Sequence, residues 1–220
     1  MNYAKYIVKD GSEISVGTMY CIGQNYAKHA AEMGSTVSEN PMVFIKPPSA
    51  YIPDGNTVKL PEFSKNIHHE VELVVLIGED CHNIEINDAY KYIAGYAVGV
   101  DVTLRDLQQA AKNAGKPWSV AKGFHTSAPI SEFIPQSQFG NEIPFFGLKL
   151  WVNDELKQSG NTQDMERDVA RLIKYIAGVF TLRSGDIIFT GTPEGVGQIK
   201  KGDLIKAELE GYVSINVGVE

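Results

Sequence analysis

The sequence predicts an α+β fold made mainly of β-strands, with a few short helices. Many short apolar runs rich in β-branched residues are separated by turn-forming residues, whereas only three or four stretches show helical spacing. Hydrophobic residues make up 43% of the 220 residues, which is enough for one sizeable core. Because there is no internal repeat and no low-complexity linker, we expect a single domain over residues 1–220.

The expected strands are short and lie throughout the chain. Residues 1–16 alternate weakly and predict a short strand or hairpin. Residues 73–77 form a continuous apolar run and predict a buried strand. Asn153-Asp154 is expected to join strands 148–152 and 155–157 in a hairpin. Further short strands are expected at 43–46, 57–60, 93–100, 187–190, 204–209 and 213–217, and 19–23 is another short apolar piece.

Four helices are expected between these strands. The clearest covers 103–112, where Thr103 can cap the helix and Asp106 occupies the capping-box position. Residues 164–180 place their apolar side chains near helical spacing. The others are expected at 25–33 and 85–92, whereas 122–144 is expected to be loop broken by short turns.

Charge and cysteine content exclude several classes of protein. The net charge is −7 and no run of Lys or Arg forms a basic patch, so we expect no nucleic-acid partner. No apolar stretch approaches the ~20 residues that span a bilayer, so we expect no membrane segment. Cys21 and Cys81 match no metal-binding spacing, and no signal peptide is recognisable. These features favour reduced thiols in a cytoplasmic protein.

Three carboxylates are candidate metal ligands. Glu70 and Glu72 are two residues apart at the start of the expected buried strand, so they point to the same face. Asp101 follows the strand 93–100 and could join them, or could simply cap the next helix. Because close buried carboxylates repel, a hard divalent cation would relieve the cost, and oxygen ligands suit Mg²⁺, Mn²⁺ or Ca²⁺. The alternative is an ordinary solvent-facing strand edge.

Other polar residues have two interpretations each. His29 and Glu32, three apart on a helix, are either a surface pair or a general base with its orienting carboxylate. Lys122 either reaches solvent or supplies a cation for an anionic substrate. Arg105 and Gln108 could hold a carboxylate from one helical face. The loop 191–197 with Thr192 lacks a nucleotide motif, and it is either a carboxylate-binding loop or a tight turn.

Taken together, an ordered set of sequence blocks resembles the fumarylacetoacetate hydrolase family, most closely its short branch of acylpyruvases, oxaloacetate decarboxylases and oxaloacetate tautomerases. The resemblance covers nearly the whole chain, and the set is specific although each block alone is weak. The blocks are CIGQNYAKHAAEM (21–33), HEVEL (69–73), GY (95–96), DVTLRDLQ (101–108), PW (117–118), AK (121–122), GD (185–186) and TGTPEGVG (190–197).

The resemblance implies a mixed β-sandwich or β-roll, usually a homodimer, and a role for each candidate residue. Glu70, Glu72 and Asp101 match metal ligands. His29 and Glu32 match a catalytic dyad on a segment that can act as a lid, and Lys122 matches an active-site lysine. Substrate-holding positions fall at Arg105, Gln108 and Thr192, and also at Gln24, where relatives often carry a basic or aromatic residue. The sequence departs from relatives again at Gly123-Phe124-His125.

The function implied is that of a divalent-metal-dependent enzyme acting on a β-dicarbonyl keto acid. Hydrolysis of an acylpyruvate, decarboxylation of oxaloacetate and its tautomerisation would all use the cation as a Lewis acid for an enolate, so the sequence leaves all three open. An isomerase or hydratase of aromatic-degradation or sugar-acid metabolism on the same fold is the alternative. A non-catalytic binding protein is disfavoured, because every acid, base and ligand position carries a competent residue.

Overall fold

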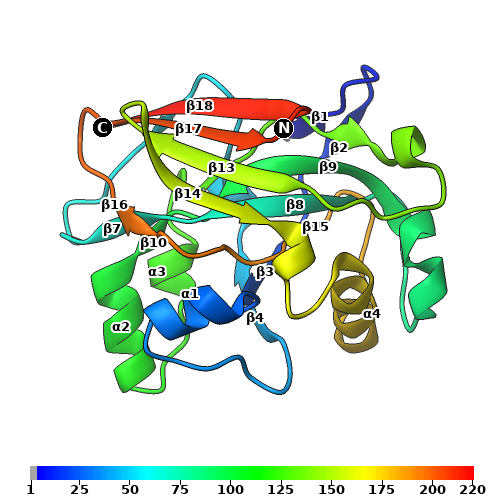
Figure 1. Ribbon diagram of the computed structural model, residues 1–220, viewed down its shortest axis with the longest axis horizontal. Helices are drawn as coiled ribbons and strands as arrows, with labels where there is room; N and C mark the ends of the chain where they lie inside the picture. The colour runs from blue at the N-terminus through cyan, green and yellow to red at the C-terminus, as the bar shows by residue number, and fades with distance from the viewer. Residues whose placement is uncertain (1–3) are drawn as a thin grey trace.

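Two β-sheets packed face to face form the centre of the computed structural model, which describes residues 4–220 (Figure 1). The first sheet contains, in spatial order, β12 (Ile134–Pro135), β9 (Ile93–Val100), β8 (Val71–Ile77), β15 (Ile187–Phe189), β3 (Met19–Gly23) and β4 (Met42–Lys46). The second contains β14 (Glu155–Asn161), β13 (Gly147–Val152), β17 (Leu204–Leu209), β18 (Val213–Val219) and β6 (Thr57–Val58).

Three small sheets and several helices complete the described part of the chain. The small sheets are β1 (Lys5–Ile7) with β2 (Glu13–Ser15), β10 (Thr103–Leu104) with β7 (Ile67–His69) and β16 (Gly197–Gln198), and β11 (Ala128–Pro129) with β5 (Tyr51–Ile52). The α-helices are α1 (Ala27–Glu32), α2 (Arg105–Asn113), α3 (Ser119–Lys122) and α4 (Val169–Val179). The 3₁₀ helices are η1 (Pro48–Ala50), η2 (Ile86–Tyr92), η3 (Gln136–Phe139) and η4 (Thr162–Asp164).

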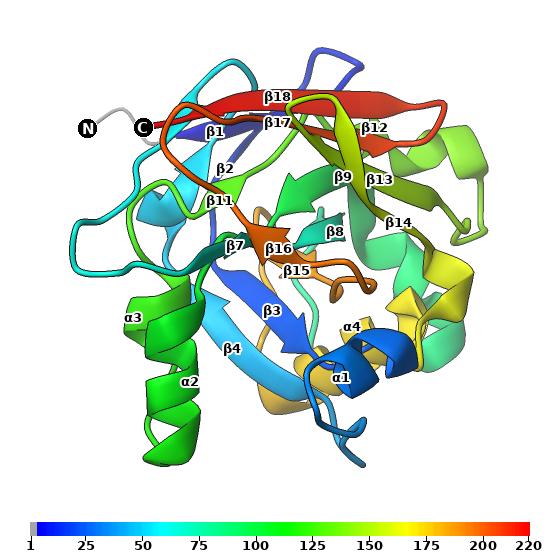
Figure 2. The same cartoon turned by 60° about the vertical axis from the view of Figure 1, so that its left-hand side comes forward.

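Strand β8 is buried on both faces, which explains its uninterrupted apolar sequence. Leu73 and Val75 point into the larger core, between the two main sheets, whereas Val74 and Leu76 pack in a second core on the opposite face. The four α-helices lie below the second sheet in the view of Figure 1, and α1, α2 and α3 lie near the edge formed by β3 and β4 (Figure 2). The buried side chains of α4 belong to the larger core. The predicted mainly-β architecture is therefore confirmed.

Most expected elements are present, and the hairpin turn follows the predicted chemistry. β13 and β14 pair antiparallel, and Asn153 and Asp154 adopt φ values of 50° and 65° in the turn. Two positive φ values are required for the tight hairpin turn that matches the twist of the strands, and Asn and Asp tolerate them. The N-terminal hairpin is formed by β1 and β2, and the expected helix at 85–92 is the 3₁₀ helix η2.

Three predictions of local structure were wrong. Thr103 does not cap α2: residues 103–104 pair with β7 as β10, and the N-cap position is Leu104. The helix expected from residue 164 begins only at Val169, where Asp168 accepts a hydrogen bond from the Arg171 N–H. The expected loop 122–144 contains β11, β12 and η3, because these short segments pair with or pack on the central strands.

Both cysteines, Cys21 and Cys81, are buried free thiols. Among residues 4–220, no helix is both long and apolar enough to cross a membrane.

Candidate active site

The pairing of β8 with β9 brings the three predicted carboxylates together. Val71 lies opposite Val100, and the Asp101 N–H donates to the carbonyl oxygen of Glu70 over 2.8 Å. Glu70, Glu72 and Asp101 are all buried, and one carboxylate oxygen from each lies within 4.8 Å of the other two. Glu70 and Glu72 therefore do not lie on a solvent-facing strand edge, and Asp101 does not cap the following helix.

Two buried lysines and an arginine compensate part of this negative charge. Lys122 Nζ lies 2.7 Å from Glu70 Oε2 and 2.6 Å from Asp101 Oδ2, so this side chain does not reach solvent. Lys46, at the end of β4, lies 2.9 Å from Asp101 Oδ1. Arg105 Nη2 contacts Glu70 Oε1. The role of Lys46 was missed in the sequence, where its only signal is a charge at the end of an apolar run.

The compensation is uneven: within residues 4–220 Glu72 forms no ion pair, and it accepts a hydrogen bond from the Gly191 N–H over 2.6 Å. Burial raises the pKa of Glu72 well above its usual value, and the charges of Asp101 and Glu70 raise it further. For Glu70, burial alone would raise the pKa, but Lys122 and Arg105 outweigh burial and hold it low. The buried Asp101 Oδ1 also receives no hydrogen bond among the described residues, although Lys46 is near it. An oxygen-preferring divalent cation fits this donor set.

Lys122 is held as a cation by its surroundings. Burial would lower the pKa of its ammonium, but Asp101 and Glu70 outweigh that effect and raise it. Its third contact is Thr103 Oγ1 at 2.7 Å. An ammonium with a raised pKa is a poor proton acceptor but a good partner for developing negative charge.

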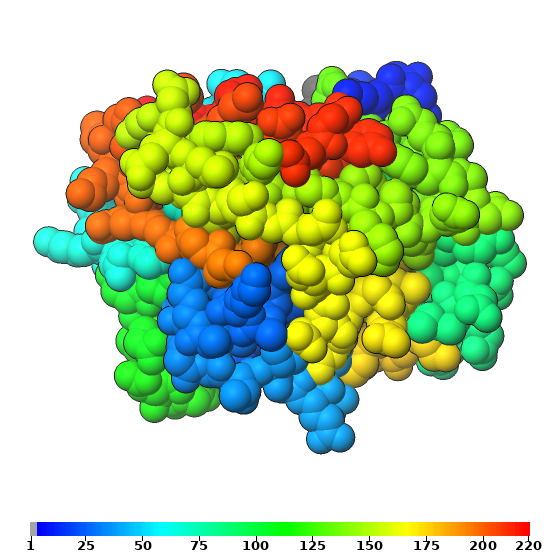
Figure 3. Space-filling model, viewed as in Figure 1, coloured from blue at the N-terminus to red at the C-terminus, as the bar shows by residue number. Residues whose placement is uncertain are grey.

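The predicted dyad is formed on α1. His29 Nδ1 lies 3.2 Å from Glu32 Oε2, with His29 buried and Glu32 exposed. The Gly195 N–H donates to the Glu32 carboxylate at 3.1 Å and 3.2 Å, which links α1 to the glycine-containing loop. The blue segment containing α1 indeed lies against the orange segment after β15 on the surface (Figure 3). The His29 side chain lines the cavity, whereas Glu32 does not, and Glu32 orients the imidazole through the contact at Nδ1.

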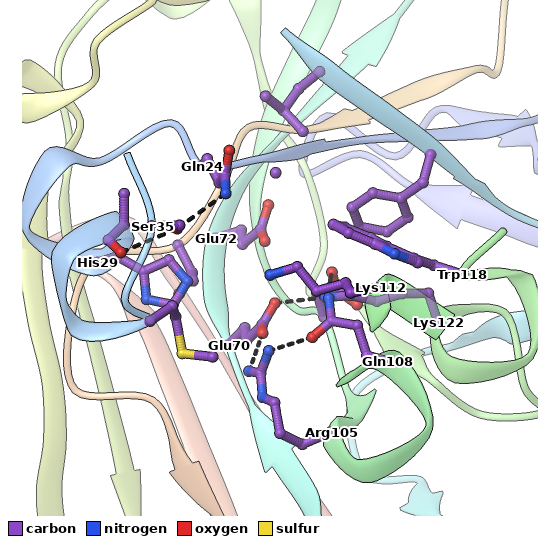
Figure 4. A pocket seen from close by; sticks show the side chains of 17 residues that line it. Gln24, His29, Ser35, Glu70, Glu72, Arg105, Gln108, Lys112, Trp118 and Lys122 are labelled. Atoms are coloured by element: carbon purple, nitrogen blue, oxygen red, sulfur yellow. Dashed lines mark hydrogen bonds and ion pairs between the residues drawn. The ribbon is translucent and has the colours of Figure 1, made fainter. Parts of the chain in front are cut away.

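One cavity collects nearly all the predicted residues, and Figure 4 shows their side chains converging on it. His29 lies on one side of the cavity, and the α2 side chains lie on another. Glu32 is the one predicted residue that does not line it. The nine that do are Gln24, His29, Glu70, Glu72, Asp101, Arg105, Gln108, Lys122 and Thr192.

The predicted substrate-holding residues are oriented by specific hydrogen bonds. Arg105 Nη1 donates to Gln108 Oε1 over 2.6 Å. Thr192 Oγ1 accepts from Gln158 Nε2 over 2.9 Å, which fixes the loop after β15. Gln24, with φ of 59°, donates to Ser35 Oγ over 3.0 Å. Phe44, Trp118 and Lys112 also line the cavity, and the sequence analysis assigned no role to any of them.

Comparison with known proteins gives three consistent findings. Residues 18–220 match the family model described as fumarylacetoacetate (FAA) hydrolase C-terminal. The chain is 43% identical over 202 residues to the mitochondrial oxaloacetate tautomerase FAHD1 of Bos taurus, covering 91% of this chain and 90% of that protein. It is 44% identical over 197 residues to the oxaloacetate tautomerase YcgM of Escherichia coli K12, covering 90% of each.

A solved structure is similar to this chain over its whole length. The fumarylpyruvate hydrolase of Pseudomonas aeruginosa, in complex with Mn²⁺ and pyruvate, superposes with a TM-score of 0.94 at 35% sequence identity. The match covers 100% of this chain and 96% of that one. The similarity therefore extends over both main sheets and the helices beside them.

Proposed function

The chain belongs to the fumarylacetoacetate hydrolase family, and we propose that it is a divalent-metal-dependent enzyme acting on β-dicarbonyl keto acids of the oxaloacetate and acylpyruvate type. One observation carries this proposal. Three buried carboxylates, one of them without an ion pair among the described residues, line a cavity that also contains His29 and Lys122. Relatives named oxaloacetate tautomerase and fumarylpyruvate hydrolase support the substrate class.

Glu70, Glu72 and Asp101 would hold the cation, and Mg²⁺ is the ion we propose, with Mn²⁺ or Ca²⁺ as alternatives. When bound, such an ion supplies Lewis-acid stabilisation for the negative charge that develops on a keto oxygen. Lys122 adds a fixed positive charge in the same region of the cavity, which favours the same charge development. Arg105, Gln108, Thr192 and Gln24 would orient the keto acid.

His29 is the proton-transfer group in this scheme. Glu32 holds the imidazole at Nδ1, which leaves the other ring nitrogen free to exchange protons with substrate or water. In hydrolysis, His29 would remove a proton from water as it attacks the distal carbonyl; in tautomerisation, it would carry a proton between carbon and oxygen. Decarboxylation requires no activated water. In tautomerisation Lys122 is the other candidate for moving this proton, because it also lines the cavity.

A panel of substrates tests the proposal. Purified protein with Mg²⁺ or Mn²⁺ should act on at least one of oxaloacetate, acetylpyruvate, fumarylpyruvate and longer acylpyruvates. Enol–keto exchange is followed by ultraviolet absorbance and pyruvate release by a coupled assay, so tautomerisation is separated from bond cleavage. Absence of both signals across the panel, with metal binding demonstrated, would refute this function and favour the isomerase or hydratase alternative.

Three further properties are part of the proposal. We propose that residues 1–220 act as one catalytic domain, in the cytoplasm, as a homodimer. Exposed apolar side chains on β4, on α3 and at the end of α4 support self-association, namely Ile45 (43% exposed), Val120 (64%) and Val179 (57%). Sedimentation velocity on the intact protein tests the dimer, and a single monomeric species at micromolar concentration would refute it.

A further inference from the structure

One face of α2 presents three polar side chains to the cavity, and only two of them have partners. Arg105, Gln108 and Lys112 are spaced three and four residues apart, so they share a helical face, and all three line the cavity. Arg105 is committed to Glu70 and to Gln108. Within residues 4–220, no hydrogen bond or ion pair reaches the ammonium group of Lys112. It is therefore a cation available to a ligand.

The surroundings of Lys112 increase its attraction for an anion. Its Nζ lies 5.6 Å from the centre of the Trp118 ring, which restrains the side chain against the cavity wall. Burial lowers the pKa of Lys112, and the positive charges of Arg105 and Lys122 also lower it. A bound carboxylate would relieve both effects, because it supplies opposite charge to an incompletely solvated ammonium.

An aromatic wall connects Lys112 to the carboxylate cluster. The Trp118 and Phe44 rings are 5.6 Å apart, and Lys122 Nζ lies 4.9 Å from the centre of the Phe44 ring. Each lysine therefore lies beside one of two neighbouring rings, Lys112 beside Trp118 and Lys122 beside Phe44, and Lys122 also contacts the carboxylate cluster. A substrate held at the carboxylates and extending along this wall would bring its far end toward Lys112.

We propose that Lys112 is a specificity-determining residue that binds the distal carboxylate of a 2-keto dicarboxylic acid. This inference rests on the proposed function, because it assumes that the keto-acid end is held at Glu70, Glu72 and Asp101. Lys112 would then distinguish substrates among the β-dicarbonyl keto acids. Dicarboxylates such as oxaloacetate and fumarylpyruvate would form an ion pair with Lys112, whereas acetylpyruvate, whose distal end is neutral, would not. Arg105 is assigned to the keto-acid end instead, because its guanidinium contacts Glu70 of the carboxylate cluster.

The kinetic test compares Lys112→Met with Lys112→Arg on both kinds of substrate. For Lys112→Met, kcat/KM for oxaloacetate and fumarylpyruvate should fall about 10- to 100-fold, the size of one hydrogen-bonded charge contact, with the loss mainly in KM. Activity on acetylpyruvate should be unchanged, and Lys112→Arg should recover most of the loss. Lys116→Met is the matched control, because Lys116 is exposed and does not line this cavity.

A binding measurement tests the same inference without turnover. Malate and lactate both carry a 2-hydroxy carboxylate, but only malate has a distal carboxylate. In calorimetry with Mn²⁺-loaded protein, Lys112→Met should weaken malate binding by the same 10- to 100-fold and leave lactate unchanged. Equal weakening of both ligands, or of neither, would overturn the role of Lys112. A wild-type protein that binds malate more tightly than lactate but turns over no keto acid would instead refute the proposed function alone.

Discussion

Lys46 and Asp101 form an ion pair inside the protein, with Nζ 2.9 Å from Oδ1 and both side chains fully buried. The same ammonium lies 2.9 Å from Ser127 Oγ and 3.0 Å from the Ser127 carbonyl oxygen. Taking both charges out of water is costly, and their pairing offsets that cost only while both are present. Lys46 thus holds Asp101 in place beside the other two carboxylates, from a strand at the opposite edge of the sheet.

Lys46→Met should lower the free energy of unfolding of the metal-free protein by about 3–5 kcal/mol, because Asp101 is left as an incompletely compensated buried charge. Urea unfolding measures the change. The loss in the double variant with Asp101→Asn should be smaller than the sum of the two single losses. Lys59→Met is the control, since its pair with Glu220 is exposed and contributes less than about 1 kcal/mol. Strict additivity would contradict the coupling.

The metal-binding role of the three carboxylates predicts large losses of affinity. Glu70→Gln, Glu72→Gln and Asp101→Asn each replace an anionic ligand with a neutral one. Changes to residues that merely orient a ligand cost about 10–100-fold in affinity, so loss of a ligand should cost at least that much. Calorimetry with Mn²⁺ measures it, with the exposed Glu155→Gln as control. Unchanged affinity in all three variants would rule out the site.

The hydrogen bonds of the Asp106 carboxylate should make the free energy of unfolding depend on pH. Its carboxylate accepts hydrogen bonds from the Ser64 hydroxyl (2.6 Å) and the Lys65 N–H (2.9 Å), and so fixes the loop before β7. Burial would raise the pKa of Asp106, but these hydrogen bonds outweigh it and the pKa is lowered. The stabilisation is therefore complete above the unfolded-state pKa and is lost as the pH falls through the lower folded-state value.

Asp106→Asn should accordingly cost about 1 kcal/mol at pH 7, and the difference from wild type should shrink as the pH falls through the lowered folded-state pKa. Urea unfolding at several pH values provides the comparison, and Asp154→Asn in an exposed turn serves as control. A difference that is constant with pH would show that the charged form of Asp106 contributes nothing.

The sequence singled out residues that the structure brings to one cavity, but it did not give their contacts. Strand β8 was recognisable because successive residues such as Leu73 and Val74 are buried in different cores, which requires an unbroken apolar run. What places Asp101 beside Glu70 is the register of β8 on β9. Register is set by the hydrophobic pattern and by turn geometry, but β8 is buried on both faces and reaches β9 through η2 without a tight turn, so neither signal fixes the pairing here.

Lys46 and Asp106 show where local signals are insufficient. A lysine at the end of a strand before prolines looks the same whether it is exposed or, as here, fully buried against a carboxylate 55 positions later in the chain. Asp106 has the spacing of a capping box with Thr103, yet Thr103 is taken by strand pairing and by contact with Lys122. The environment of Lys46 and the role of Asp106 are both set by residues distant in the sequence, so a short stretch of sequence does not reveal them.

The segment from Tyr26 to Val37 is predicted to behave as a lid. Its ties to the facing loop are the hydrogen bonds from Gly195 to Glu32 and an exposed ion pair between Lys28 and Glu194. We expect fast amide hydrogen exchange there in metal-loaded protein and slower exchange when oxalate, an enolate mimic, is added. Residues 73–77 of β8 provide the internal control, because a buried central strand should stay protected in both states. Equal exchange of the segment in both states would refute the lid.

The division of labour between His29 and Lys122 can be separated by measuring two reactions. If His29 activates water, His29→Ala should reduce acylpyruvate hydrolysis by about 10²–10⁴-fold. Oxalate affinity should stay within a few-fold, because the carboxylate cluster and Arg105 are intact. Oxaloacetate decarboxylation needs no activated water, so the variant should retain relatively more of it.

Lys122→Met should behave differently, because the cation it removes lies beside the position where negative charge develops in both reactions. At saturating metal, hydrolysis and decarboxylation should fall together by about 10²–10³-fold, the size of one lost contact to an oxyanion. Saturating metal is required since Lys122 also contacts two of the proposed ligands. If both variants depress both reactions equally, His29 acts in holding substrate or closing the site, and the assignment of His29 as the base for water attack is wrong.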